Sequence, residues 1–194
     1  LGMTEVDASF ENPVSLGAVG ESCWIVDRPA GRVLLYDGAA ASRTGEWRGL
    51  DRPGRVAAFL SPAGDGLQEA WVFLGCSESP LRCAGLVKLD RDREPMEVVM
   101  PFFDGVALSV DNRSGDCWVL GETELAAFDR NGNLLFQIDG APGGRDLAVD
   151  GANRQVWIAG STVTWKFAMT EQVPVSLTGF TGLHRIQVDP GGGG

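Results

Sequence analysis

Apolar residues in this chain gather in short runs separated by polar turns, and four of these runs share one pattern. Each run places a tryptophan among five or six mostly apolar residues and ends in Gly or Asp: residues 23–27, 70–75, 117–121 and 156–160. The tryptophans, Trp24, Trp71, Trp118 and Trp157, are 47, 47 and 39 residues apart. A period of about forty residues with strand-like content indicates a radial β-repeat. The runs lack period-two alternation, which is typical of strands covered on both faces.

Each repeat also contains three further predicted strands. The strand after the tryptophan run closes on an acidic residue, at 32–37, 86–90 and 124–129, and a turn such as Asn131-Gly132 follows it. A less regular strand comes next, at 97–100, 134–138 and 174–177. A Gly-rich connection then leads to the last strand, and residues 138–150 match residues 177–189 in length and in the phase of their apolar positions. The repeating unit is therefore four short strands.

Four-stranded repeats of this length, arranged radially, are β-propeller blades. We expect an all-β chain, residues 1–194 forming one propeller domain with four four-stranded blades at about 12–50, 55–101, 105–139 and 145–178 and an extra inner strand at 183–189. Residues 4–10 are a candidate outer strand that closes a ring. The spacing predicts a further tryptophan strand after Asp189, which favours a piece of a larger propeller over a four-bladed ring with a spare strand.

The order of these signals resembles NHL-repeat and related six-bladed propellers: Val-Asp, a turn, the tryptophan run, a strand ending in Asp, Gly-Asn, and Gly before the next Val-Asp. This resemblance implies the fold, but it leaves activity open, because the group mixes lactonases, lyases, peptide-processing enzymes and binding modules. Its lactonases hold a divalent cation with Glu, Asn and Asp from several blades, whereas the matching positions here include Val56, Ala57, Val106 and Ala107. The histidines of the lyases are missing too. The comparison therefore predicts no metal and no cofactor, and it favours a non-enzymatic protein without deciding the question.

Charge excludes one class of partner. The chain has 16 basic and 26 acidic residues, a formal net charge of −10, and its basic residues are scattered singly. Nucleic-acid binding requires a clustered basic surface, so we expect no nucleic-acid partner. No apolar run approaches the roughly 20 residues of a membrane-spanning helix, so we expect no transmembrane segment.

Four cysteines bear on the compartment. Cys76 and Cys83 flank a loop of six residues, a spacing that permits a disulfide, although two unpaired thiols are the alternative. Such a bond is rare in the cytosol and predicts a secreted, periplasmic or cell-surface protein. Cys23 and Cys117 each precede a repeat tryptophan, and we expect both to be free and buried.

Candidate ligand-binding residues gather where the innermost strands of the last repeats begin: Arg145, Asp146, His184 and Arg185. His184 is the only histidine, and with Asp146 it would form an acid–base pair, while the alternative is a solvated rim with an Arg–Asp ion pair. Asp129, Asn131 and Asn133 have the alternate spacing of a calcium loop but lack its later Glu, so ordinary hairpin bonding is the preferred interpretation. The loop that holds Cys76 and Cys83 is eight residues longer than its counterpart in the next repeat, so it is either a recognition loop or a tolerated insertion.

These observations give three hypotheses of function. The first is a non-enzymatic propeller that binds a protein partner or builds an assembly. The second is a small-molecule enzyme of the lactonase or lyase kind that acts at the channel mouth. The third is a structural module of an extracellular filament or surface layer.

Overall fold

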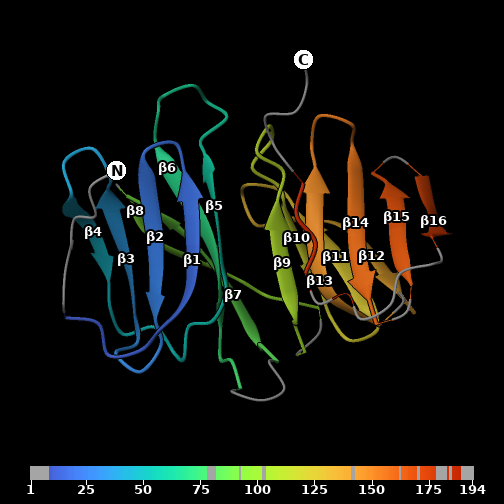
Figure 1. The fold of residues 1–194 in the computed structure, drawn as a ribbon, viewed down its shortest axis with the longest axis horizontal. Coiled ribbons are helices and arrows are strands. Elements are labelled where there is room, and N and C mark those ends of the chain that lie inside the picture. The colour runs from blue at the N-terminus through green and yellow to red at the C-terminus, as the bar shows by residue number, and fades with distance from the viewer. Residues whose placement is uncertain are drawn as a thin grey trace. The chain divides into compact units, whose positions relative to one another are not determined.

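The chain is all β in the computed structural model, which describes residues 9–77, 82–91, 93–101, 104–140, 143–161, 163–169, 171–177, 183 and 185–188. These residues form four antiparallel sheets of four strands each (Figure 1). This result confirms the predicted four-stranded units. No helix among the described residues is long and apolar enough to cross a membrane.

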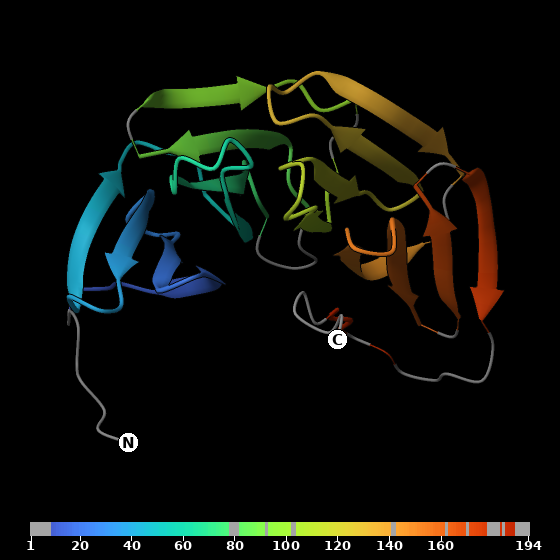
Figure 2. The ribbon, with the colours of Figure 1, turned by 90° about the horizontal axis from the view of Figure 1, so that it is seen from above.

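Each sheet uses four strands that follow one another in the chain. Sheet 1 contains β1 (Pro13–Val19), β2 (Ser22–Asp27), β3 (Arg32–Asp37) and β4 (Ser42–Trp47), and sheet 2 contains β5 (Val56–Leu60), β6 (Gln68–Leu74), β7 (Gly85–Asp90) and β8 (Arg93–Val98). Sheet 3 contains β9 (Ala107–Val110), β10 (Cys117–Leu120), β11 (Glu124–Phe128) and β12 (Leu134–Asp139), and sheet 4 contains β13 (Gly144–Asp150), β14 (Gln155–Gly160), β15 (Thr164–Ala168) and β16 (Glu171–Leu177). Figure 2 shows the strands of sheets 1 and 4 lying in chain order across each sheet.

The chain divides into two compact units, residues 1–99 with sheets 1 and 2 and residues 100–194 with sheets 3 and 4. In unit 1 the first strands of the two sheets, β1 and β5, lie side by side. Gly17 allows this approach, because a Cβ there would lie 3.3 Å from the backbone N of Ala58. The Ser15 hydroxyl accepts a hydrogen bond of 3.2 Å from the Val56 N–H, and apolar side chains of both sheets form one core.

Unit 2 repeats this arrangement. Strands β9 and β13 lie side by side, and the Ser109 hydroxyl accepts a hydrogen bond of 3.2 Å from the Val149 N–H. The core again joins the two sheets, through residues such as Leu120 and Ile158. Each pair of sheets is therefore joined mainly by side-chain packing.

The four repeat tryptophans occupy equivalent places in the second strand of each sheet. Each pairs with a residue at the same place in the third strand of its sheet: Trp24 with Leu35, Trp71 with Lys88, Trp118 with Ala127 and Trp157 with Lys166. Trp24, Trp71 and Trp118 are buried, as expected, but Trp157 is only half-buried. Trp157 is less covered than the other three because Val156 and Ile158, not Trp157, point into the core shared with sheet 3.

The only two lysines of the chain occupy the same register position in sheets 2 and 4. Lys88 is buried, forms an ion pair with Glu69, and has its Nζ 5.9 Å from the centre of the Phe59 ring. The Nζ of Lys166 lies 5.4 Å from the centre of the Trp157 ring. In both sheets the lysine side chain therefore lies against an aromatic ring, and in sheet 2 its charge is also paired with Glu69.

The extra inner strand expected at 183–189 is not formed by the residues that are described there. Leu183 and residues 185–188 belong to no strand, while His184 and Asp189 lie outside the described residues. Of the candidate outer strand at 4–10, residues 4–8 are not described, and Ser9 and Phe10 belong to no strand.

Candidate functional site

A pocket of about 640 Å³ lies in unit 1 at the edge of the sheets where the first strands begin. We call this the start edge of a sheet; the turn between its second and third strands and the connection into its first strand both lie there. The pocket, here called the arginine pocket, is lined by Asn12, Val14, Arg28, Pro29, Arg52, Cys76 and Ser77. The lining combines two guanidinium groups with apolar surface and with polar backbone.

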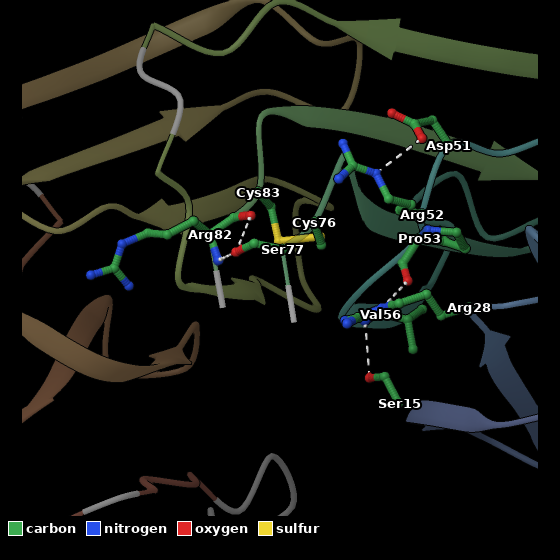
Figure 3. The surroundings of a disulfide bond; sticks show 10 residues. All are labelled: Ser15, Arg28, Asp51, Arg52, Pro53, Val56, Cys76, Ser77, Arg82 and Cys83. Atoms are coloured by element: carbon green, nitrogen blue, oxygen red, sulfur yellow. Dashed lines mark hydrogen bonds and ion pairs between the residues drawn. A yellow bond between two sulfur atoms is a disulfide. The ribbon is translucent and has the colours of Figure 1, made fainter. Parts of the chain in front are cut away.

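Arg28 reaches the pocket from the turn between β2 and β3. Its Nε donates a hydrogen bond of 3.1 Å to the carbonyl of Pro53, which fixes the base of the guanidinium group (Figure 3). Among the described residues, no carboxylate forms an ion pair with Arg28. Its terminal nitrogens therefore remain available to an anion in the pocket.

Arg52 reaches the pocket from the connection between β4 and β5. Its backbone has φ of 39°, in the left-handed region that non-glycine residues seldom adopt. The Cys76 N–H donates to the Arg52 carbonyl at 3.1 Å, and the Gly75 N–H donates to the Asp51 carbonyl at 2.8 Å. These bonds hold the residue in a conformation that an arginine does not favour by itself.

The Arg52 side chain has one charged neighbour, Asp51, whose Oδ1 accepts a bond of 3.2 Å from Nε. Both side chains are exposed, by 61% and 71%. An exposed ion pair contributes only about 0–1 kcal/mol, so the Asp51 carboxylate is a partner that a ligand can replace.

Cys76 lines the pocket and forms a disulfide with Cys83, which confirms the predicted pairing. Both cysteines are buried, and a Cβ at Gly54 would lie 2.4 Å from the Cys76 Sγ, so the bond packs directly on the Gly54 backbone. Next to the disulfide, the Ser77 N–H donates to the Arg82 carbonyl at 2.8 Å (Figure 3). The described ends of the long loop are therefore fixed against the sheet. In this view the Arg82 side chain extends away from Arg28 and Arg52 (Figure 3).

A buried aspartate anchors the opposite wall. The Asp27 carboxylate accepts hydrogen bonds from the Asn12 N–H at 2.9 Å, from the Glu11 N–H at 3.2 Å and from the Arg32 guanidinium at 2.8 Å. Burial opposes its ionisation, yet these bonds together hold the pKa of Asp27 below its ordinary value. Asp27 thus fixes the backbone of Asn12 by a hydrogen bond, and it fixes the position of Arg28 because Arg28 is the next residue in the chain.

The four residues predicted for ligand binding lie in unit 2, and the structure describes three of them. Arg145 is an exposed residue in a register irregularity of β13, and Arg185 is exposed outside any strand. Asp146 is buried, and its Oδ2 accepts a hydrogen bond of 3.0 Å from the Ile186 N–H. His184 lies outside the described residues, so its pairing with Asp146 stays a prediction.

The Asp–Asn turn considered as a calcium loop uses its polar groups internally. The Asp129 carboxylate accepts bonds of 2.8 and 2.9 Å from the N–H groups of Asn131 and Asn133 and a third from the Asn133 side chain. Burial opposes ionisation, but these bonds lower the pKa of Asp129 below its ordinary value. Within the described part of the chain, no three His, Cys, Asp or Glu side chains are grouped to hold a metal ion.

The two remaining cysteines are free in the structure. Cys117 is buried as expected, and burial, with the Asp116 charge, raises the pKa of its thiol well above the ordinary value. Cys23 is half-buried instead, since its side chain points away from the core that Trp24 enters. Burial raises its thiol pKa as well.

Sequence reasoning missed Arg28 and Arg52. It considered only the residues where the first strands begin, such as Val56 and Ala57, and overlooked the turns that reach the same edge. Two signals were available: the long cysteine loop, and arginines within the turn after β2 and the connection before β5.

Comparisons with known proteins identify the fold. No family model matches the sequence, and no curated protein is similar to it. The structure is similar to that of hydrazine synthase from Kuenenia stuttgartiensis, with a TM-score of 0.64 and 12% identity over 92% of this chain. It is also similar to a chain of the nidogen/laminin complex, with a TM-score of 0.64 and 10% identity over 91% of this chain.

The chain spans about half of that hydrazine synthase chain (53%) and 68% of the chain from the nidogen/laminin complex. Both neighbours are propeller-type structures, and likeness at such low identity carries the fold alone. The kinship with NHL-repeat propellers stays a prediction. The chain has a β-propeller fold with four four-stranded blades among its described residues.

Proposed function

We propose that this chain is a non-enzymatic propeller module of a secreted, periplasmic or cell-surface protein and that it binds a protein partner through its start edge. The observation that carries this proposal is the arginine pocket, which turns and connections build at one edge of unit 1. Binding residues on propellers and other scaffolds are commonly placed on such loops.

Two further observations support the proposal. The Cys76–Cys83 bond is typical of an oxidising compartment. One structural neighbour comes from a complex between two proteins, nidogen and laminin, although its partner does not carry over to this chain.

The compartment is tested in the source cells. Free thiols are alkylated at lysis, and mass spectrometry then determines whether residues 76 and 83 are linked or alkylated. Linked cysteines are expected, while alkylation of both would contradict an oxidising compartment.

The partner is tested with the chain as bait. The oxidised chain is immobilised and exposed to the secreted and envelope fractions of the same cells, and sedimentation velocity follows the chain alone. A protein retained at a fixed ratio to the bait and displaced by free chain supports the proposal. A monomer that retains nothing displaceable would argue against both partner binding and self-assembly.

A further inference from the structure

We propose that the arginine pocket binds side-chain carboxylates of an acidic peptide segment, with Arg28 and Arg52 as its two cationic contacts. This inference rests on the proposed function, because it states the chemistry of the partner. It concerns a site in unit 1 that is separate from Arg145, Asp146, His184 and Arg185.

The charge of the pocket points to an anion. Two guanidinium groups line it, and their terminal nitrogens match the two oxygens of a carboxylate. Among the described residues, Arg28 is tied only through Nε, to the Pro53 carbonyl, and Arg52 only through Nε, to an exposed Asp51. The terminal nitrogens of both residues can therefore bind a carboxylate without breaking a buried interaction.

The size and lining of the pocket point to a peptide. A volume of about 640 Å³ exceeds what a single inorganic anion fills. Val14 and Pro29 add apolar surface beside the arginines, which suits the methylene groups of a glutamate side chain. The mixed lining thus favours a carboxylate on a carbon chain over a free oxoanion.

The backbone of Arg52 supplies an independent argument. A left-handed φ of 39° would suit Gly or Asn, yet the chain has an arginine there, on the rim of a pocket. Among the described residues, Ala41 and Arg154 also have a left-handed φ, but of the three only Arg52 lines the pocket. Bonds from Cys76 and Gly75 hold this segment, so the strain and the disulfide loop belong to the same site.

The net charge of −10 does not oppose local binding. At physiological ionic strength, charges more than about 8 Å away are largely screened. A site with two arginines therefore attracts an acidic segment although the chain as a whole repels it.

The test measures fluorescence anisotropy of a labelled hexaglutamate peptide with the oxidised full chain, and uses a hexaglutamine peptide as the neutral probe. Arg28→Gln and Arg52→Gln are each expected to weaken hexaglutamate binding by about 10-fold or more. Arg43→Gln is the matched control, since it removes the same charge from the opposite end of sheet 1, and it is expected to bind within about twofold of wild type. Hexaglutamine is expected not to bind.

Two further variants sharpen the result. Asp51→Asn removes the competing carboxylate and is expected to tighten binding about two- to fivefold, whereas Glu21→Gln, with the same charge change in an exposed turn at the opposite edge, is not. Arg28→Lys keeps the positive charge but loses the planar guanidinium group that binds both oxygens of a carboxylate, so it is expected to weaken hexaglutamate binding. If Arg28→Gln does not fold, Arg28→Lys and Arg52→Gln carry the test.

Four results would overturn the proposal. Equal loss in Arg43→Gln and the pocket variants would show a general charge effect. Displacement of the peptide by sulfate at lower concentration than by malonate would identify an oxoanion site, and malonate binding more tightly than the peptide would identify a small-acid site. Capture of a partner by the bait, unchanged in Arg28→Gln, would show that the chain binds a protein partner but not through the arginine pocket.

Discussion

The start edges of the two units are built from the same strand arrangement and carry different loops. In unit 1 the turn after the second strand of sheet 2 spans 75–84 and carries a disulfide, and the edge includes Arg28 and Arg52. In unit 2 the corresponding turn of sheet 3 spans only 121–123, and the Glu122 N–H donates to the Asp104 carboxylate at 3.1 Å. The long turn borders a pocket with two arginines, whereas the short turn of sheet 3 is bonded to an aspartate. Equivalent scaffolds thus differ in chemistry through their turns alone.

The largest effect is expected from the buried anchor of unit 1. Asp27→Asn leaves the Arg32 guanidinium buried without its closest countercharge, so unfolding in urea is expected to show a loss of about 3 kcal/mol or more. Asp129→Asn removes a carboxylate of the same kind from an exposed turn in unit 2 and is expected to cost about 1 kcal/mol. Equal costs would mean that the two units do not differ in this way.

The same anchor gives unit 1 a dependence on pH. Because the pKa of Asp27 is lowered in the folded state, its contribution is fully present above the ordinary aspartate value of about 3.9. It is lost as the pH falls through the lowered folded value. Urea unfolding followed from pH 6 to 2 should therefore show an acid loss that Asp27→Asn reduces.

Next in size is removal of the disulfide. Replacing Cys76 and Cys83 by serine opens a short loop and is expected to cost about 2–3 kcal/mol. Hydrogen exchange should accelerate at the amides of Gly54 and Gly75 in unit 1, and exchange at Gly121 in unit 2 should not change. Thiol titration of unfolded, unreduced wild type should find two thiols, those of Cys23 and Cys117. Uniform acceleration in both units would show that the bond stabilises more than its own loop.

Gly54→Ala tests the packing beneath the pocket. The new Cβ meets the Cys76 Sγ at 2.4 Å, so either the disulfide or the backbone shifts, at a cost of about 1–3 kcal/mol. In the double variant without the disulfide, serine oxygens are smaller than sulfur and the cost should fall. An unchanged cost would locate the clash elsewhere.

The smallest effect on stability is expected from Arg52→Gly. Glycine removes the steric cost of the left-handed backbone, but it also increases the entropy of the unfolded chain. The free energy of unfolding should therefore be unchanged or higher by at most about 1 kcal/mol. Arg154→Gly, an arginine with φ of 54° in a turn of unit 2, is the matched control and should behave alike in thermal unfolding. Only Arg52→Gly should lose hexaglutamate binding; a loss in both would contradict a role for the pocket.

The sheets were predictable from sequence, and the pocket was not. Tryptophans 39 to 47 residues apart indicated the strands because each must be covered by neighbouring residues, and the spacing of Cys76 and Cys83 indicated their bond. Arg28 and Arg52 are 24 positions apart in turns without a repeat, and they line one pocket only because turns of adjacent sheets share one edge. The half-exposure of Trp157 depends on which face of β14 meets a neighbour, which the apolar run does not reveal.

Neighbouring sheets within a unit touch through side chains and one serine hydroxyl, and among the described residues no hydrogen-bonded ladder continues from one sheet into the next. A turn can therefore lengthen without shifting the register of the adjoining sheet. Each sheet therefore packs on its neighbour as a separate hydrogen-bonded unit. For protein engineering, this means that the 75–84 loop should be able to replace the short 121–123 turn of sheet 3 without disturbing the neighbouring sheet.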